Sequence, residues 1–228
     1  TWQGNPVRTL FRYFCNPHSA FRQRMDLVLI HGMGRTPLSM ARLRRRLRRA
    51  RHHPGLFGYA PPVETLQGAV ERLVKLIDRR VDTGNYALVG HSLGTVVIRA
   101  ALGQLENRAP SACLFLAPPM VACRAARFFS RFRLYRLLTG EMGQLLALES
   151  FMLPLPMPSM PTRIYAGVGC PRAPWLPFGM EASDCILGVS EATGRFEAES
   201  LKVPCTHTFI MNSKQVFDDM VDFLKPLA

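Results

Sequence analysis

The stretch Tyr86-Ala-Leu-Val-Gly90-His91-Ser92-Leu93-Gly94-Thr95 decides the fold of this chain. It begins with a short apolar run typical of a buried strand, and the apolar residues that follow it are enough to open a buried helix. The pattern G-x-S-x-G between them predicts a sharp strand-to-helix turn, because small residues two before and two after the serine avoid collisions with neighbouring backbone. We therefore expect Ser92 to be a nucleophile at a helix N-terminus; a plain glycine-rich loop is the alternative interpretation.

Strand-like and helix-like patterns alternate on both sides of this turn. Buried-strand patterns lie at 26–30, 56–59, 112–117, 163–168 and 201–203, and amphipathic helix patterns lie at 39–51, 65–80 and 213–224. This order predicts a parallel sheet covered by helices on both faces. The 228 residues are sufficient for one α/β domain, which we place at 26–228, with residues 1–25 as an N-terminal arm.

The character of the sequence changes between about 120 and 160. Arg124 to Leu138 mixes aromatic residues with five arginines, Thr139-Gly140 ends this run, and prolines gather at 154–158. We expect a small cap-like insertion over the strand ends that lines a pocket for an apolar substrate. An ordinary pair of packing helices is the alternative.

A nucleophilic serine needs a base and a third group that orients the base. His207 follows a late strand in a loop, where it can reach the carboxyl edge of the sheet. We expect His91 to point away from Ser92 and His31 to brace its loop by hydrogen bonds. The remaining histidines lie outside such a loop: His18, His52 and His53.

Asp184 is the preferred acid because it lies in a loop after the 163–168 strand, 23 residues before His207. The order Ser92, Asp184, His207 is the nucleophile, acid and base order of the α/β-hydrolase fold. Glu181 and Glu191 are the fallback acids. The carboxylates of the last helix, which are Asp218, Asp219 and Asp222, look solvated.

An acyl-transfer site also needs donors for the oxyanion. Leu93 opens the helix after Ser92, so its backbone N–H faces a developing negative charge. His31-Gly32-Met33-Gly34 directly follows the 26–30 strand. We expect the N–H of Met33 to be the second donor, because Gly32 lets the backbone bend into the site.

The charge is strongly basic, with 29 Lys and Arg against 16 Asp and Glu, which gives +13. Seven arginines fall within Arg42 to Arg51, around an apolar stripe of the 39–51 helix. Such a helix is either a solvated surface or a surface that faces anions or a membrane. It lacks the interleaved aromatic residues that stack on bases, so nucleic acid is not expected.

The six cysteines lack CxxC or CxxH spacing, so no zinc site is expected: Cys15, Cys113, Cys123, Cys170, Cys185 and Cys205. Most have apolar neighbours, which favours buried reduced thiols. Cys170 and Cys185 form a disulfide only if the compartment is oxidising.

Several motifs together make the chain resemble a small bacterial α/β-hydrolase of the lipase and esterase type, over Asp26 to Leu224. Two of them, His31-Gly32 and Gly90-His91-Ser92-Leu93-Gly94, are shared by many hydrolases. The others are similar to those of a narrower group of mostly uncharacterised serine hydrolases, and they are Leu138-Thr139-Gly140 with Gly143-Gln144, and Thr206-His207-Thr208-Phe209-Ile210-Met211. The resemblance implies the α/β-hydrolase fold, a triad of Ser92, His207 and Asp184, ester hydrolysis, and neither a metal nor an organic cofactor.

Two residues depart from that group. Thr95 stands where many relatives have a second glycine, which narrows the space behind the turn. Asp184 is followed by Cys185-Ile186 instead of the common Asp-Gly, and this weakens the assignment of the acid.

The leading expectation is therefore an enzyme that cleaves acyl esters, including lipids, through an acyl-enzyme. The alternative is a non-catalytic module of the same fold that binds a membrane surface or a partner. We expect contact with an anionic membrane mainly through Arg42–Arg51, to which Phe128–Leu138 adds. The sequence favours a cytoplasmic location or one peripheral to the inner membrane, leaves open an anchor or signal before Thr1, and does not determine the oligomeric state.

Overall fold

The computed structural model describes residues 24–81, 85–194 and 200–227. In these ranges six strands form one sheet in the order β2-β1-β3-β4-β5-β6, and every neighbouring pair is parallel. The strands are β1 (Asp26–Ile30), β2 (His53–Phe57), β3 (Tyr86–His91), β4 (Ala112–Leu116), β5 (Thr162–Gly167) and β6 (Ser200–Val203). This confirms the predicted fold class. The predicted arm at 1–25 lies, except for its last two residues, outside the described residues.

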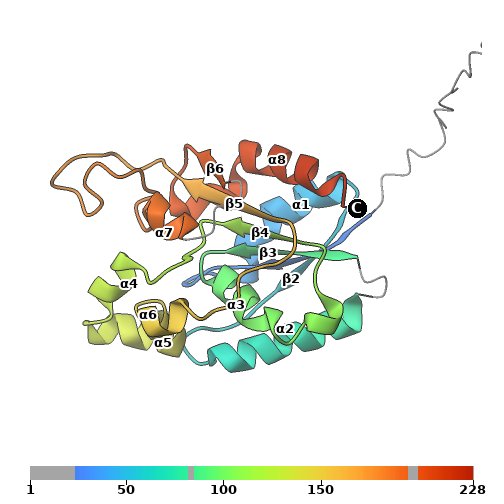
Figure 1. Ribbon diagram of the computed structural model, residues 1–228, viewed down its shortest axis with the longest axis horizontal. Helices are drawn as coiled ribbons and strands as arrows, with labels where there is room; N and C mark the ends of the chain where they lie inside the picture. Colours follow the sequence, from blue (N-terminus) through green and yellow to red (C-terminus); the bar gives the residue numbers. More distant parts are fainter. Residues whose placement is uncertain (1–23, 82–84, 195–199, 228) are drawn as a thin grey trace, which may run out of the picture.

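Helices cover both faces of the sheet (Figure 1). One face carries α1 (Ala41–Arg49) and α8 (Lys214–Leu224), and the other carries α2 (Leu66–Arg80) and α3 (Leu93–Leu102). Successive strand residues point to opposite faces, so Leu27 and Leu29 join the first core while Val28 and Ile30 join the second. The remaining helical elements are η1 (Pro37–Met40), η2 (Glu106–Arg108), α4 (Arg124–Phe129), α5 (Arg133–Leu145), α6 (Glu149–Met152), α7 (Val189–Thr193) and η3 (His207–Asn212).

One predicted strand had the wrong bounds. The strand expected at 56–59 is β2 at His53–Phe57, because it pairs with β1 from Asp26 opposite His53 onward. Pro54 made the first half of this strand hard to recognise from the sequence, because proline is rare inside strands. It is tolerated here because β2 is an edge strand. The sequence did not divide the stretch from Arg124 to Leu138 into elements. In the structure α4 and α5 are separated at Phe132, whose backbone is extended, and α5 continues past Leu138 to Leu145 with a kink at Gly140.

Asp219 does not look solvated in the structure, contrary to expectation. Its carboxylate accepts two hydrogen bonds from the Arg163 guanidinium, at 2.9 and 2.7 Å, so the pair joins β5 to α8. Hydrogen bonding to Arg163 lowers the pKa of Asp219. Asp218 and Asp222 contact Lys214 and Lys225 at the exposed surface, as their predicted position implies.

The segment expected as a cap-like insertion, about 120–160, contains α4, α5 and α6. It packs on the α2 and α3 side of the sheet through residues that include Ala126, Met142 and Met152. Arg99 of α3 fastens it there. The Arg99 side chain is buried and donates to the carbonyls of Met120 at 3.0 Å and Leu155 at 2.9 Å, and burial lowers its pKa to about 10.

We expect Arg99→Met to lower the free energy of unfolding by about 2–4 kcal/mol, because buried carbonyls lose their donors. Urea denaturation followed by circular dichroism measures this. Arg45→Met, at an exposed position of α1, is the matched control and should leave the unfolding midpoint unchanged. Equal effects of the two substitutions would show that Arg99 does not fasten the segment.

Candidate active site

Ser92 lies on the sharp turn between β3 and α3, with φ 50° and ψ −121°. This backbone conformation is costly for a residue with a side chain. A Cβ at Gly90 would come within 2.8 Å of the backbone nitrogen of Thr95, and one at Gly94 within 2.6 Å of the carbonyl oxygen of His31. The two glycines are therefore required by close packing, as the sequence pattern predicted.

Hydrogen bonds hold the turn in this conformation. The Ser92 N–H donates to the carbonyl of Leu116 in β4 at 2.9 Å, and Thr95 donates to the Ser92 carbonyl from both its N–H and its hydroxyl, at 2.9 and 2.7 Å. The sequence suggested only that Thr95 narrows the space behind the turn. Its hydroxyl bond to Ser92 is a supporting contact that sequence reasoning missed.

His207 opens η3, directly after β6 and the short connection that follows it. Its Nδ1 lies 2.7 Å from Oδ2 of Asp184, and its backbone N–H donates to the Asp184 carbonyl at 2.9 Å. On the other side, Nε2 of His91 donates to the His207 carbonyl at 3.0 Å. These contacts leave Nε2 of His207 as the ring nitrogen available for a proton from the cavity.

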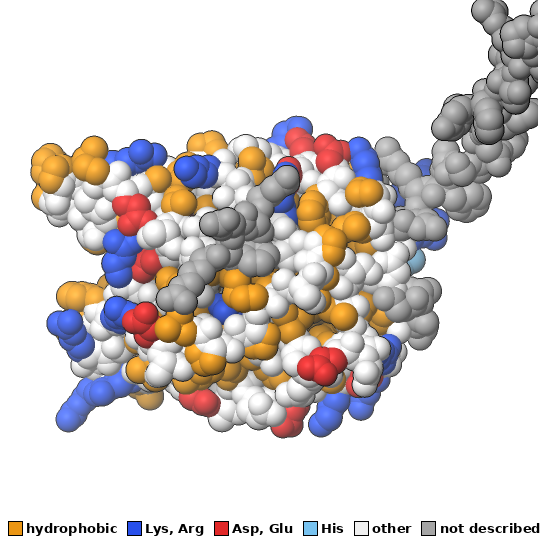
Figure 2. All heavy atoms as spheres, viewed as in Figure 1, with side chains coloured by type: hydrophobic (Ala, Val, Ile, Leu, Met, Phe, Trp, Pro, Cys, Tyr) orange, Lys and Arg blue, Asp and Glu red, His pale blue; other side chains and the backbone are white. Residues whose placement is uncertain are grey.

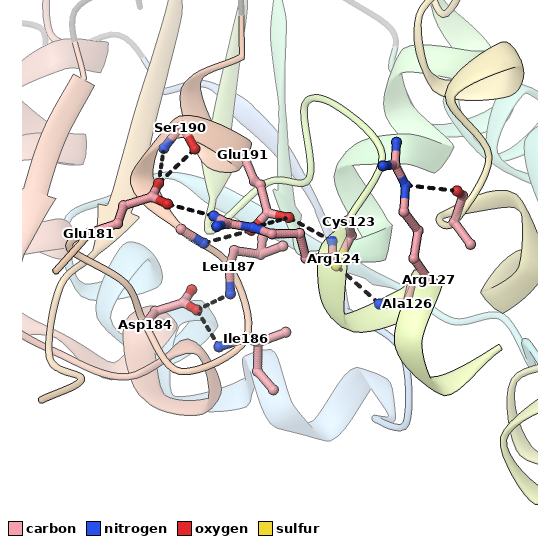
Figure 3. Close-up of polar contacts among 12 residues, drawn as sticks. Cys123, Arg124, Ala126, Arg127, Glu181, Asp184, Ile186, Leu187, Ser190 and Glu191 are labelled. Atoms are coloured by element: carbon pink, nitrogen blue, oxygen red, sulfur yellow. Dashed lines mark hydrogen bonds and ion pairs between the residues drawn. The ribbon is translucent and has the colours of Figure 1, made fainter. Parts of the chain in front are cut away.

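The Asp184 carboxylate is almost completely buried. While Oδ2 faces His207, Oδ1 accepts the backbone N–H groups of Ile186 at 2.9 Å and Leu187 at 2.7 Å (Figure 3). These bonds compensate the burial of a charge and fix the direction in which the carboxylate points.

Cys185, which follows Asp184, is bonded to Cys170 by a disulfide with its Cα atoms 5.2 Å apart. The expectation of reduced thiols was therefore wrong for this pair, because a loop of 15 residues brings the two cysteines together. Cys185 has φ 78°, a conformation that favours glycine. This explains why Asp-Gly suits the position. With Cys185 there, Asp184 still contacts Ile186, Leu187 and His207. Cys113, Cys123 and Cys205 are free.

The fallback acids have other partners. Glu191 accepts the backbone N–H of Arg124 at 2.6 Å, and Glu181 accepts the Arg124 guanidinium at 2.6 Å and the Ser190 hydroxyl at 2.6 Å. Figure 3 shows the Arg124 side chain reaching both carboxylates. They therefore join α4 to the loop around α7, and the carboxylate that contacts His207 is that of Asp184.

The loop after β1 packs directly against the Ser92 turn. A Cβ at Gly32 would come within 2.7 Å of the His91 ring and 3.0 Å of Ser92 Cβ, so only glycine fits there. His31 braces this loop as expected: Nδ1 donates to the Gly32 carbonyl at 2.9 Å, and its ring stacks on Tyr59. Leu93 is the first residue of α3, where a helix leaves its N–H groups without intrahelical partners.

A cavity of about 490 Å³ opens between these groups. Ser92 and His207 line it together with Met33, and the rest of its wall is mainly apolar. The other lining residues are Gly34, Arg35, His91, Pro119, Cys123, Ala125, Ala126, Phe129, Tyr135, Leu146, Ile186, Leu187 and Thr208. The sequence indicated that 120–160 would line a pocket, but side-chain periodicity could not identify the individual residues.

No group of three or more His, Cys, Asp or Glu side chains within the described ranges is arranged to hold a metal ion. Among the same residues, no helix combines the length and apolar character that crossing a bilayer requires.

A parallel sheet with a serine on a strand-to-helix turn and a His–Asp pair in later loops defines the α/β-hydrolase class. The chain belongs to the alpha/beta hydrolase family, whose model matches residues 27–207. The resemblance found in the sequence is thus confirmed, and the protein is a hydrolase. No curated protein matches the sequence.

Solved structures of hydrolases share the fold. An extracellular α/β-hydrolase from a Paenibacillus species is 15% identical with a TM-score of 0.60, and the match covers 90% of this chain and 99% of that one. A thermophilic esterase from Thermogutta terrifontis is 15% identical, with a TM-score of 0.59 and coverage of 89% and 90%. A thioesterase of the prodiginine pathway of Streptomyces coelicolor is 17% identical, with a TM-score of 0.57 and coverage of 100% and 97%.

Two buried histidines beside the site make stability depend on pH. Burial lowers the pKa of His91 well below its usual range, and the nearby His207 acts in the same direction. Burial also lowers the pKa of His31, against its hydrogen bonds with Gly32 and Tyr59. In the unfolded chain both imidazoles bind protons near pH 6.5.

Below about pH 6.5 the unfolded chain therefore binds more protons, and we expect the free energy of unfolding to fall by up to about 1.4 kcal/mol per pH unit for each histidine. Urea denaturation at pH 7.5 and 5.5 measures the fall. His91→Gln keeps a donor for the His207 carbonyl but does not titrate, so its fall should be smaller. An identical fall in this variant would exclude His91 as a contributor.

Proposed function

We propose that this hydrolase cleaves carboxylic esters with Ser92 as nucleophile, His207 as base and Asp184 as the group that orients the imidazole. The observation that carries the proposal is the 2.7 Å contact between Nδ1 of His207 and the buried Asp184 carboxylate, beside a cavity that Ser92 and His207 share. A hydrogen bond at Nδ1 directs the other ring nitrogen toward a proton in the cavity.

In the first half of the reaction, the Ser92 hydroxyl attacks the ester carbonyl carbon while Nε2 of His207 takes its proton. The N–H groups of Met33 and Leu93 stabilise the oxyanion. The tetrahedral intermediate then breaks its bond to the alcohol oxygen, and the imidazolium returns the proton to this leaving group. In the second half, water activated by His207 attacks the acyl-enzyme and releases the carboxylic acid.

The cavity favours an apolar acyl group. Its wall includes Ala126, Phe129, Leu146 and Leu187, which offer no charge to a bound chain. A cavity of about 490 Å³ suits an acyl chain of medium length. Because the structural relatives include an esterase and a thioesterase, acyl thioesters are the first alternative substrates to test.

We expect Ser92→Ala to lower kcat for p-nitrophenyl butyrate by on the order of a millionfold, because no other hydroxyl occupies the turn. A fluorophosphonate probe should label the wild-type chain at Ser92 and leave the variant unlabelled. Ser159→Ala, at an exposed serine, is the matched control and should be labelled like the wild type. If the wild-type chain forms no adduct and hydrolyses neither esters nor thioesters, the fold is used as a non-catalytic binding module.

We expect Asp184→Asn to lower kcat by about 10⁴, since the imidazole loses the partner that sets its tautomer. The two fallback acids supply matched controls: Glu191→Gln and Glu181→Gln change the same charge in the same loop region and should have much smaller effects on kcat. Circular dichroism verifies that each variant is folded. A large loss in a glutamate variant with little loss in Asp184→Asn would assign the acid to that glutamate.

A further inference from the structure

Helices α4 and α5 expose a group of large apolar side chains. We name it the α4–α5 surface, and its apolar members are Phe128, Phe132, Leu134, Leu137 and Leu138, with exposed fractions of 53%, 51%, 66%, 73% and 58%. The three leucines follow helical spacing on α5, and the two phenylalanine rings contact each other, with their centroids 5.7 Å apart. Contiguous exposed apolar side chains of this kind mark an interaction surface.

Arginines are concentrated in the first part of this surface, and the exposed Glu141 follows on α5. The segment 124–140 has five arginines and neither aspartate nor glutamate. Arg124 and Arg127 form ion pairs with carboxylates of neighbouring elements. Arg131, Arg133 and Arg136 form no ion pair with any residue that the structure describes, so their charges are available to an anionic partner.

The same segment forms one wall of the catalytic cavity. Ala125, Ala126, Phe129 and Tyr135 line the cavity, and the Phe129 ring stacks on Tyr135 and contacts Phe128. Ring contacts therefore connect Phe128 of the exposed surface with Phe129 and Tyr135 of the cavity wall. Figure 1 places α4 and the loop before α7 at the same end of the molecule, and Figure 2 shows hydrophobic and basic side chains side by side there.

We propose that the α4–α5 surface docks on an anionic phospholipid bilayer and holds the cavity beside the lipid. Aromatic and leucine side chains enter the interfacial region, while arginines extend to the phosphate groups. The charge favours this partner, because Arg131, Arg133 and Arg136 have no ion pair among the described residues and lie beside exposed apolar side chains, a combination that suits anionic phosphate groups above an apolar layer. That the enzyme takes its acyl substrate from the bilayer rests on the proposed function, whereas the docking does not.

Helix α1, which the sequence favoured as the main membrane contact, lies on the opposite face of the sheet from α4 and α5. Its Leu43 and Leu47 are buried in the core, and it exposes arginines without large apolar side chains among them. Arg45 and Arg49 of this helix supply a matched control, because replacing both changes the net charge by the same amount as replacing Arg133 and Arg136 of α5.

The test is co-sedimentation of the full chain with vesicles of phosphatidylcholine and phosphatidylglycerol, compared with vesicles of phosphatidylcholine alone. At low salt, the double variant Arg133→Gln/Arg136→Gln should bind the anionic vesicles about twenty-five-fold more weakly, since each basic residue near an anionic leaflet contributes about fivefold. Arg45→Gln/Arg49→Gln should bind like the wild type. Leu134→Ser/Leu137→Ser should weaken binding at high salt as well, because its contribution is not screened.

Equal losses from the α1 and α5 arginine pairs would overturn the proposal, since binding would then depend on total charge. So would equal binding to both kinds of vesicle, or no binding to either. If Leu134→Ser/Leu137→Ser instead abolishes a concentration-dependent dimer on size-exclusion chromatography while no vesicle is bound, the surface joins two copies of the chain and the proposal is wrong.

Hydrolysis of soluble p-nitrophenyl butyrate separates this proposal from the proposed function. None of the α5 variants changes a residue of the cavity, so all should hydrolyse the soluble ester like the wild type. Vesicle binding by a chain that hydrolyses no ester would support the docking and contradict the esterase. Ester hydrolysis without vesicle binding would support the esterase and contradict the docking.

Discussion

The structure depends on the close approach of backbone segments around Ser92. A Cβ at Gly94 would collide with the carbonyls that end β1, and one at Gly90 would collide with the first turn of α3. The Ser92 N–H is bonded in turn to the end of β4. Three parallel strands and one helix therefore meet at a single point, and a strained serine is stable there because each neighbour limits its movement.

The parallel sheet brings the other candidate site residues to the same edge. Met33 follows β1, Ser92 follows β3 and His207 lies beyond β6, and all three line one cavity; Asp184 lies beyond β5 and contacts His207. Buried polar groups hold the connecting segments in place. Arg99 fastens the 120–160 segment to α3, and Glu191 fastens α4 to the loop around α7. Their hydrogen bonds position the cavity wall and offset part of the cost of burial, which lowers the pKa of Arg99.

The two basic helical regions differ in what surrounds their arginines. On α1 the apolar side chains are directed into the core, whereas on α4 and α5 they remain exposed beside the arginines. A sequence pattern counts charges along one helix but does not reveal which apolar residues are already covered. The sequence therefore named Phe128–Leu138 only as an addition to the α1 helix, and the structure separates the two by placing α1 on one face of the sheet and α4 and α5 on the other.

The sequence by itself determined the strand and helix order, the Ser92 turn and the loop position of His207, because these depend on local periodicity and on glycines at fixed spacing. Only the tertiary structure decided that Asp184 contacts His207 while Glu181 and Glu191 bind Arg124, since all three carboxylates lie within eleven residues of one another. The Arg163–Asp219 pair was equally undetermined, whereas the sequence had named Cys170 and Cys185 as the pair able to form a disulfide. Such contacts join residues distant in sequence, and no local pattern encodes which partners the folded chain brings together.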